Sequence, residues 1–166
     1  MTAGTFKATV CGVSQSPTRL AVSVRDFDFV IDEPAALGGT DAGPNPVEFV
    51  LASFAGCINV VIHMVAKERG VEIRGLRVNV QGELDPSRLM NILTDHRAGF
   101  QSIEMVAEID SDATDEEIDE LLRIAETRCP VADNLGNATP ISLRRASTDG
   151  EPSDSEMLVP TGGTRR

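Results

Sequence analysis

Apolar and polar residues alternate with a period of two in several short segments, a pattern typical of β-strands in which one face is buried. In the longest segment the apolar positions are Val71, Ile73, Leu76, Val78 and Val80. The pattern predicts strands over residues 6–12, 20–25, 27–31, 71–83, 103–109 and 141–145. Residues 20–25 and 27–31 form either one strand or a pair.

Two longer segments have helix start and stop signals. A loop rich in Gly and Pro ends at Asn45, a good N-cap that is followed by proline at the first helical position. The first helix should then run to residue 69 and stop at Gly70. A second helix is expected from residue 112, where acidic residues suit the first turn, and Pro130 should end it near residue 129.

The first helix is unusual because residues 49–66 carry no formal charge. This length reaches the threshold for a membrane span, but the polar residues Ser53, Asn59 and His63 interrupt the stretch, and we expect no such span. A helix that is apolar on all sides is covered by a sheet or by a second subunit. We therefore expect one domain of mixed helices and strands, and a homodimer that buries the first helix.

The chain is expected to form one domain over residues 1–146 and a flexible C-terminal tail over residues 147–166. The 166 residues are enough for one domain with a hydrophobic core. The last twenty are mainly Asp, Gly, Pro, Ser and Thr, a composition that offers little apolar surface to bury.

Charge and composition exclude some functions. The net charge of -11 disfavours binding to nucleic acid, and the absence of Trp and Tyr removes most stacking platforms. No secretory signal is visible at the N-terminus, so a cytoplasmic location is expected and the three cysteines should be thiols. No Cys or His pair has metal-ligand spacing, and we expect neither a metal nor a cofactor.

Two cysteines are candidates for chemistry. Cys57 lies in the middle of the first helix, where burial would keep its thiol inert unless a cation such as an arginine activates it. Taken alone, Cys57 is better interpreted as a small core residue. Cys129 stands at a helix end before Pro130, where we expect it to be accessible and able to move, as a resolving thiol must. The spacing alone does not show that the two cysteines meet.

Several motifs of this chain resemble those of one known family. The sequence from Asp32 through Gly38-Gly39-Thr40-Asp41 to Asn45-Pro46 and Gly56-Cys57 is similar to the signature of the OsmC/Ohr family. Arg128-Cys129-Pro130 resembles its second cysteine motif. Further similarity, at residues 97–100 and 133–135, is to a branch described as OsmC-like, and the whole resemblance covers about residues 7–145.

This resemblance implies an α+β fold in which two main helices pack against antiparallel sheets. It also implies a thiol-dependent hydroperoxide reductase in an intertwined homodimer, with the active site at the subunit interface. Cys57 would match the cysteine that attacks the peroxide, and Cys129 the one that resolves it to a redox-active disulfide. Such peroxiredoxin-like proteins belong to antioxidant defence in the oxidative stress response. The expected partners are an organic hydroperoxide and an external dithiol, lipoyl or thioredoxin-like, that restores both thiols.

The rest of the site departs from the family pattern. The family places a catalytic Glu directly after the Asn-Pro pair, where this chain has Val47, and Glu48 follows one position later. Because one helical position is about 100° of rotation, Glu48 is a candidate for the catalytic acid but better suits a capping box. The activating arginine has three candidates, Arg19, Arg25 and Arg97, of which we prefer Arg25.

Two alternatives stay open. The first is a non-enzymatic OsmC-like protein that binds an apolar small molecule at the dimer groove. Val47 favours it, whereas retention of both cysteines opposes it. The second is general thiol–disulfide exchange, which the absence of a C-x-x-C motif disfavours. The loss of the Arg–Glu pair would slow thiolate formation, so a peroxidase of this sequence is expected to be slow or specialised.

Overall fold

The computed structural model describes residues 4–146, which divide into two compact units. The first unit takes its described residues from 4–46 and 141–146, and the second is Val47–Pro140. The tail expected over residues 147–166 lies outside the described residues.

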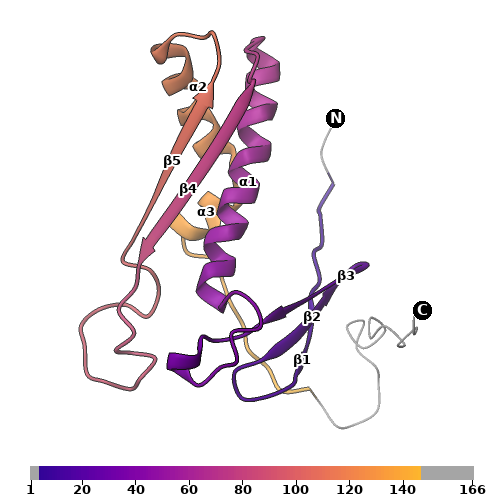
Figure 1. Cartoon of the computed structure of the whole chain (residues 1–166), viewed down its shortest axis with the longest axis vertical. Coiled ribbons are helices and arrows are strands. Elements are labelled where there is room, and N and C mark those ends of the chain that lie inside the picture. The colour runs from indigo at the N-terminus through magenta and orange to yellow at the C-terminus, as the bar shows by residue number, and fades with distance from the viewer. Residues whose placement is uncertain (1–3, 147–166) are drawn as a thin grey trace. The chain divides into compact units, whose positions relative to one another are not determined.

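The first unit contains a three-stranded antiparallel sheet in the order β1-β2-β3 (Figure 1). The strands are β1 (Cys11–Ser14), β2 (Leu20–Val24) and β3 (Phe27–Ile31). In the central strand, Val22 is buried and pairs with Gly12 on one side and Phe29 on the other. The sheet therefore confirms the two strands expected over residues 20–31, joined by a tight hairpin.

The loop after β3 is organised around the carboxylate of Asp32, which is fully buried. It accepts hydrogen bonds from the Thr40 hydroxyl at 2.6 Å and from the backbone N–H groups of Thr40, Ala42 and Glu33. The Thr40 hydroxyl foremost, and then these N–H groups, hold the pKa of Asp32 at about 2, although burial acts in the opposite direction. Gly39 is required there, because a Cβ atom at this position would lie 1.7 Å from the carbonyl oxygen of Glu33.

In the second unit, α1 (Pro46–Arg69) is the long apolar helix. It ends as the sequence predicts: Gly70 has a φ of 71°, and the N–H groups of Gly70 and Val71 bond to the carbonyls of Lys67 and Ala66. This pattern is a Schellman motif, which satisfies carbonyls at the helix end. Among the described residues, α1 is the one helix long and apolar enough to cross a membrane, and 33% of its most apolar window is buried.

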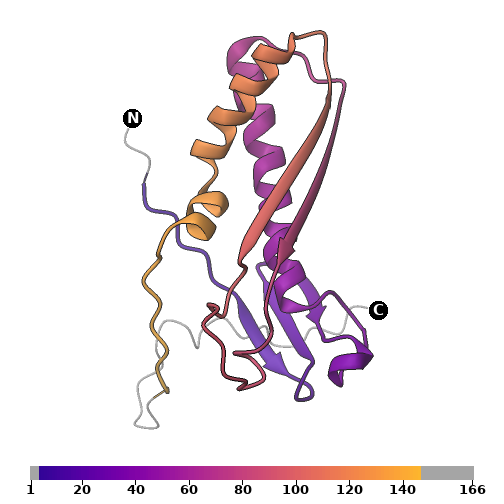
Figure 2. The same cartoon turned by 90° about the vertical axis from the view of Figure 1, so that its left-hand side faces the viewer.

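A two-stranded antiparallel sheet and two further helices complete this unit (Figures 1 and 2). The strands are β4 (Gly75–Glu83) and β5 (Ser102–Asp110), and the helices are α2 (Asp115–Arg128) and α3 (Pro130–Gly136). Thr114 and Glu117 form a capping box at the start of α2. The alternating inner faces of β4 and β5 pack against the helices, so the α+β class is confirmed.

The core of the second unit lies between α1 and α2, which run side by side in opposite directions (Figures 1 and 2). Ile58 and Ile62 of α1 and Leu121 and Ala125 of α2 are all fully buried. Their spacing of four residues places each pair on one face of its helix. The core thereby fixes the two helices that carry the candidate cysteines.

Three sequence expectations about element boundaries are wrong. The first strand begins at Cys11 rather than at residue 6, and the strand expected from residue 71 begins at Gly75. The second difference has a local cause, because Val71 closes the Schellman motif of α1. Residues 141–145 form no strand, and they are exposed.

Candidate active site

The structure brings Cys57 of α1 and Cys129 together, although they are far apart in the sequence. Both thiols are free, and the side chain of Cys129 lies near enough to Cys57 to raise the pKa of its thiol. Cys129 packs in the same hydrophobic cluster as Ile58 and Ala125, and Cys57 lies at its border. The packing of α1 against α2 therefore supplies what the spacing alone did not show.

Cys129 is less accessible than its position at a helix end suggests. Its side chain is 1% exposed, so the expectation of an accessible cysteine is wrong. The reason is that the chain continues as a helix: Cys129 is the N-cap of α3, with Pro130 at the first position. Its Sγ atom accepts a hydrogen bond from the N–H of Ala132 at 3.4 Å.

Cys57 is half-buried, and its surroundings in the second unit favour the neutral thiol. Burial raises the pKa of Cys57 above its ordinary value, because it removes water from the thiolate. The backbone N–H of Val131 donates to its sulfur and acts in the opposite direction, while the neighbouring Cys129 raises the pKa further. Rapid reaction at neutral pH therefore requires a cation beside this thiol.

A cavity of about 530 Å³ is lined by residues close in sequence to the two cysteines, although neither cysteine forms part of its wall. Phe54, one turn before Cys57, forms part of its wall, and so does Ala132, which binds the sulfur of Cys129. Most of the remaining wall is apolar, with the charged residues Arg97 and Glu126 also present. The cavity can hold an apolar molecule close to the cysteine pair.

The two neighbouring residues at the start of α1 face different cavities. Val47 forms part of the wall of the large cavity. Glu48 is exposed and lines a smaller one of about 280 Å³, together with Leu51 and Ala55. At the position where the resemblance expects an acid, the large cavity is therefore lined by an apolar side chain.

Of the three candidate arginines, Arg97 belongs to the same unit as the cysteines and lines the large cavity. The side-chain amide of Gln101 donates to the carbonyls of Arg97 and Gly99, at 3.0 and 2.9 Å, and fixes this turn. The other two candidates are in the first unit. Arg25 lies exposed in the β2–β3 turn with a φ of 52°, and its guanidinium stands 5.1 Å from the centre of the Phe27 ring.

Arg19 is half-buried in the first unit. Its Nε atom is the one buried side-chain nitrogen or oxygen in residues 4–146 that has no hydrogen-bond partner there. Such an atom is costly to leave unpaired, so Arg19 has an unused donor. Cys11, the third cysteine, lies half-buried in β1.

The sequence analysis missed α3 and the two N–H groups at its start that contact the sulfurs. Pro130 was the sequence signal that could have revealed this helix, because proline suits the first position of a helix as well as the end of the preceding one. The structure adds no metal centre to this picture: in residues 4–146 no three His, Cys, Asp or Glu side chains lie together as metal ligands.

Comparison with known proteins points to one family. The profile of the OsmC-like protein family matches residues 39–144, which include both Cys57 and Cys129. No match is found among curated protein sequences.

Solved structures show the same fold. The chain is similar to an OsmC-like protein from Mycoplasma pneumoniae, with a TM-score of 0.69 and 23% identity over 79% of this chain and 88% of the other. It is also similar to an organic hydroperoxide resistance protein from Legionella pneumophila, with a TM-score of 0.62 and 18% identity over 80% and 91% of the two chains. A third, from Elizabethkingia anophelis, is an organic hydroperoxide resistance protein with a TM-score of 0.59 and 19% identity over 80% and 89%.

Proposed function

The chain belongs to the OsmC-like protein family, and from this membership we propose that it is a cysteine-dependent hydroperoxide reductase. The observation that carries the proposal is the pair of free thiols, Cys57 and Cys129, which lie close together at the border of the hydrophobic core. A largely apolar cavity, lined by Phe54 and Ala132, lies next to these residues in the same unit. Structural relatives that are named organic hydroperoxide resistance proteins support the same class of substrate.

In the proposed reaction the Cys57 thiolate attacks the peroxide O–O bond. Cys57 becomes a sulfenic acid, and the other oxygen leaves with the organic group, takes up a proton and forms an alcohol. The Cys129 sulfur then attacks the sulfenic sulfur, so that an S–S bond forms and water leaves. An external dithiol, lipoyl or thioredoxin-like, restores both thiols by exchange.

The apolar wall of the cavity favours organic hydroperoxides over hydrogen peroxide. Phe54, Val50 and Leu135 offer apolar surface to the organic group of a substrate, and hydrogen peroxide has no such group. We expect kcat/KM for cumene hydroperoxide to exceed that for hydrogen peroxide by at least about tenfold, the discrimination that one or two buried apolar groups provide.

We propose Arg25, the candidate preferred from the sequence, as the residue that activates Cys57, with Arg19 and Arg97 as the other candidates. Because burial raises the pKa of the Cys57 thiol, a guanidinium is needed to increase the thiolate fraction at neutral pH. Glu48 is the acid nearest in sequence to the position at which the family has its catalytic Glu. Substitutions of Glu48 and Val47, described below, test whether Glu48 contributes to catalysis. We place this reaction in the cytoplasm, where dithiol reductants are available.

The experiment mixes reduced protein with one equivalent of cumene hydroperoxide, counts free thiols and maps the product by mass spectrometry. Two thiols should be lost, with a crosslink between Cys57 and Cys129, while Cys11 remains open to alkylation as an internal control. Cys57→Ser should lose no thiol rapidly, and Cys129→Ser should stop at sulfenic or sulfinic acid on Cys57. Survival of both thiols for hours would refute the peroxidase.

We also propose a homodimer that covers α1. The exposed side of this helix has a row of small and apolar residues four positions apart, Ala52, Gly56, Val60 and Met64, of which Val60 is 55% and Met64 49% exposed. An apolar row of this kind is the usual sign of a helix–helix interface. Val60→Glu should convert the dimer to a monomer in analytical ultracentrifugation, whereas Lys67→Glu at the polar end of the helix should not. A monomeric wild-type protein at micromolar concentration would contradict the proposal.

A second candidate function is supported by Val47. With an apolar side chain where the family pattern has an acid, the cavity suits a non-enzymatic protein that binds an apolar small molecule. If the thiols survive the hydroperoxide, this function predicts that an apolar fluorescent probe binds the protein and that Phe54→Ala weakens the binding. Failure of both the thiol and the probe experiments would exclude both functions.

A further inference from the structure

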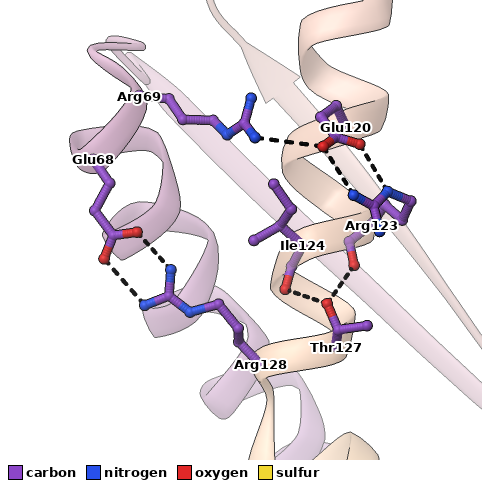
Figure 3. A network of polar contacts seen from close by, with 7 residues as sticks. All are labelled: Glu68, Arg69, Glu120, Arg123, Ile124, Thr127 and Arg128. Atoms are coloured by element: carbon purple, nitrogen blue, oxygen red, sulfur yellow. Dashed lines mark hydrogen bonds and ion pairs between the residues drawn. The ribbon is translucent and has the colours of Figure 1, made fainter.

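Charged side chains join the end of α1 to α2 along one side of the second unit (Figure 3). Arg128 makes two parallel contacts with Glu68, Nη1 to Oε2 at 2.5 Å and Nη2 to Oε1 at 3.0 Å. Farther up the helices Arg69 meets Glu120 in one contact of 3.4 Å. Arg123 also binds Glu120, but both of these residues belong to α2.

The pair of Arg128 and Glu68 acts at one particular point of the fold, because Arg128 is the last residue of α2 and directly precedes Cys129. Side chains in a helix lean towards its N-terminus. Since α1 and α2 run in opposite directions, Glu68 and Arg128 lean towards each other from the two helices (Figure 3). Two parallel N–H···O bonds fix the orientation of the guanidinium as well as its distance.

The last turn of a helix is where the backbone opens most readily. At the end of α2 the backbone N–H of Cys129 bonds to the carbonyl of Glu126, and beyond it the chain turns into α3. A disulfide tolerates only a narrow range of Cα–Cα distances. Opening of this turn would therefore carry the Cys129 sulfur away from Cys57 and delay the second step of the reaction.

We propose that Glu68 and Arg128 are positioning residues that keep Cys129 in place to capture the sulfenic acid on Cys57. This inference rests on the proposed peroxidase function. Capture competes with a second peroxide molecule, which transfers an oxygen to the sulfenic acid, gives a sulfinic acid on Cys57 and leaves as an alcohol. The ratio of disulfide to sulfinic acid therefore measures how well Cys129 is positioned.

The first test compares Arg128→Gln with Arg123→Gln, which removes the same charge from the same helix but breaks no contact with α1. At increasing cumene hydroperoxide, Arg128→Gln should give roughly tenfold more Cys57 sulfinic acid than wild type, because small misplacements of reacting groups cost large factors in rate. The rate of the first step should stay within about twofold of wild type, since Arg128 does not touch Cys57. Arg123→Gln should match wild type both in the amount of Cys57 sulfinic acid and in the rate of the first step.

The geometry of the pair predicts how substitutions rescue it. Arg128→Lys keeps the charge but loses the fork of two bonds, so it should restore only part of the disulfide yield. The double variant Glu68→Arg with Arg128→Glu reverses the pair and should recover more disulfide than either single reversal. A double variant no better than the single ones, or an Arg128→Gln protein with the wild-type ratio, would overturn the inference.

A measurement without peroxide separates this inference from the peroxidase proposal. In a glutathione redox buffer, the fraction of protein with a Cys57–Cys129 disulfide reports how close the two thiols are held. Arg128→Gln should lower the equilibrium constant for this disulfide roughly tenfold, the same loss as in the capture step. An unchanged constant would refute the positioning role even if wild type reduces peroxide. A lowered constant in a protein inert to peroxide would uphold the positioning role and refute the peroxidase.

Discussion

Asp32 and Cys57 can both carry a negative charge, and their surroundings differ in the number of hydrogen-bond donors. The carboxylate of Asp32 is fully buried and accepts four hydrogen bonds, which hold its pKa at about 2. The Cys57 sulfur is only half-buried, but its one backbone donor is Val131, and burial raises its pKa. Donors and burial act in opposite directions at both groups: the donors prevail at Asp32 and lower its pKa, whereas burial prevails at Cys57 and raises its pKa.

The same comparison divides the family signature into two parts. The segment from Asp32 to Asn45 builds a rigid loop, in which Thr40 and Gly39 have structural roles. The segment that ends in Cys57 places a thiol where burial raises its pKa. The predictions below test each part by removing or adding a polar group.

The largest effect is expected for Asp32→Asn. An amide at this position presents an N–H group to the donors of Thr40 and Ala42, so several partly buried hydrogen bonds to residue 32 are lost. The Tm should fall by roughly 10 °C in differential scanning calorimetry at neutral pH. Asp28→Asn is the matched control. The carboxylate of Asp28 is exposed and accepts one hydrogen bond, from the Ser23 hydroxyl, so its replacement should change the Tm little.

The pH dependence of this effect has a definite sign. The pKa of Asp32 is lowered in the folded protein, from its ordinary value of 3.8 to about 2. Its contribution to stability is therefore complete well above pH 3.8 and is lost as the pH falls towards 2. The difference in Tm between wild type and Asp32→Asn should narrow over this window. A difference that stays constant down to pH 2 would show that the charge of Asp32 does not stabilise the loop.

A smaller effect is expected at Cys57 when its proposed cation is removed. In Arg25→Gln, alkylation of Cys57 by iodoacetamide at pH 7 should slow by at least about tenfold, because loss of a neighbouring cation raises a thiol pKa by one unit or more. The rate at Cys57 is followed by mass spectrometry from pH 6 to 10, with Cys11 as the reference thiol. Arg19→Gln and Arg97→Gln are the matched variants. If the curve of Arg25→Gln coincides with that of wild type, Arg25 is not the activating residue.

The ends of α1 are predictable from sequence because their signals are local. Pro46 and Gly70 mark them directly, and the helix ends as expected at Arg69. The terminal strand segments are not predictable in this way. Alternation of apolar and polar residues over 6–12 and 141–145 is a property of each segment alone, whereas a strand also needs a partner strand. Most of these residues pair with no strand among the described residues.

The candidate site is predictable only in part. The motifs single out Cys57 and Cys129, but their meeting depends on the packing of Ile58 against α2, which no local pattern encodes. The contact between Glu68 and Arg128 joins residues 60 positions apart and is likewise invisible in the sequence. Val47 is the exception, because the rotation of 100° per helical residue correctly separates it from Glu48.

The smallest effects are expected at these two neighbouring positions, and they test whether the cavity beside Cys57 depends on its apolar wall. Val47→Asn places a polar amide in that wall without restoring the acid of the family pattern, which should lower kcat/KM for cumene hydroperoxide about fivefold, as expected from the loss of one apolar side chain. Glu48→Gln alters a different cavity and should change kcat/KM by less than about twofold. Steady-state rates with cumene hydroperoxide and hydrogen peroxide measure both variants. A loss of tenfold or more in Glu48→Gln would make Glu48 the catalytic acid, and Cys57 would then depend on a charged neighbour as Asp32 depends on its donors.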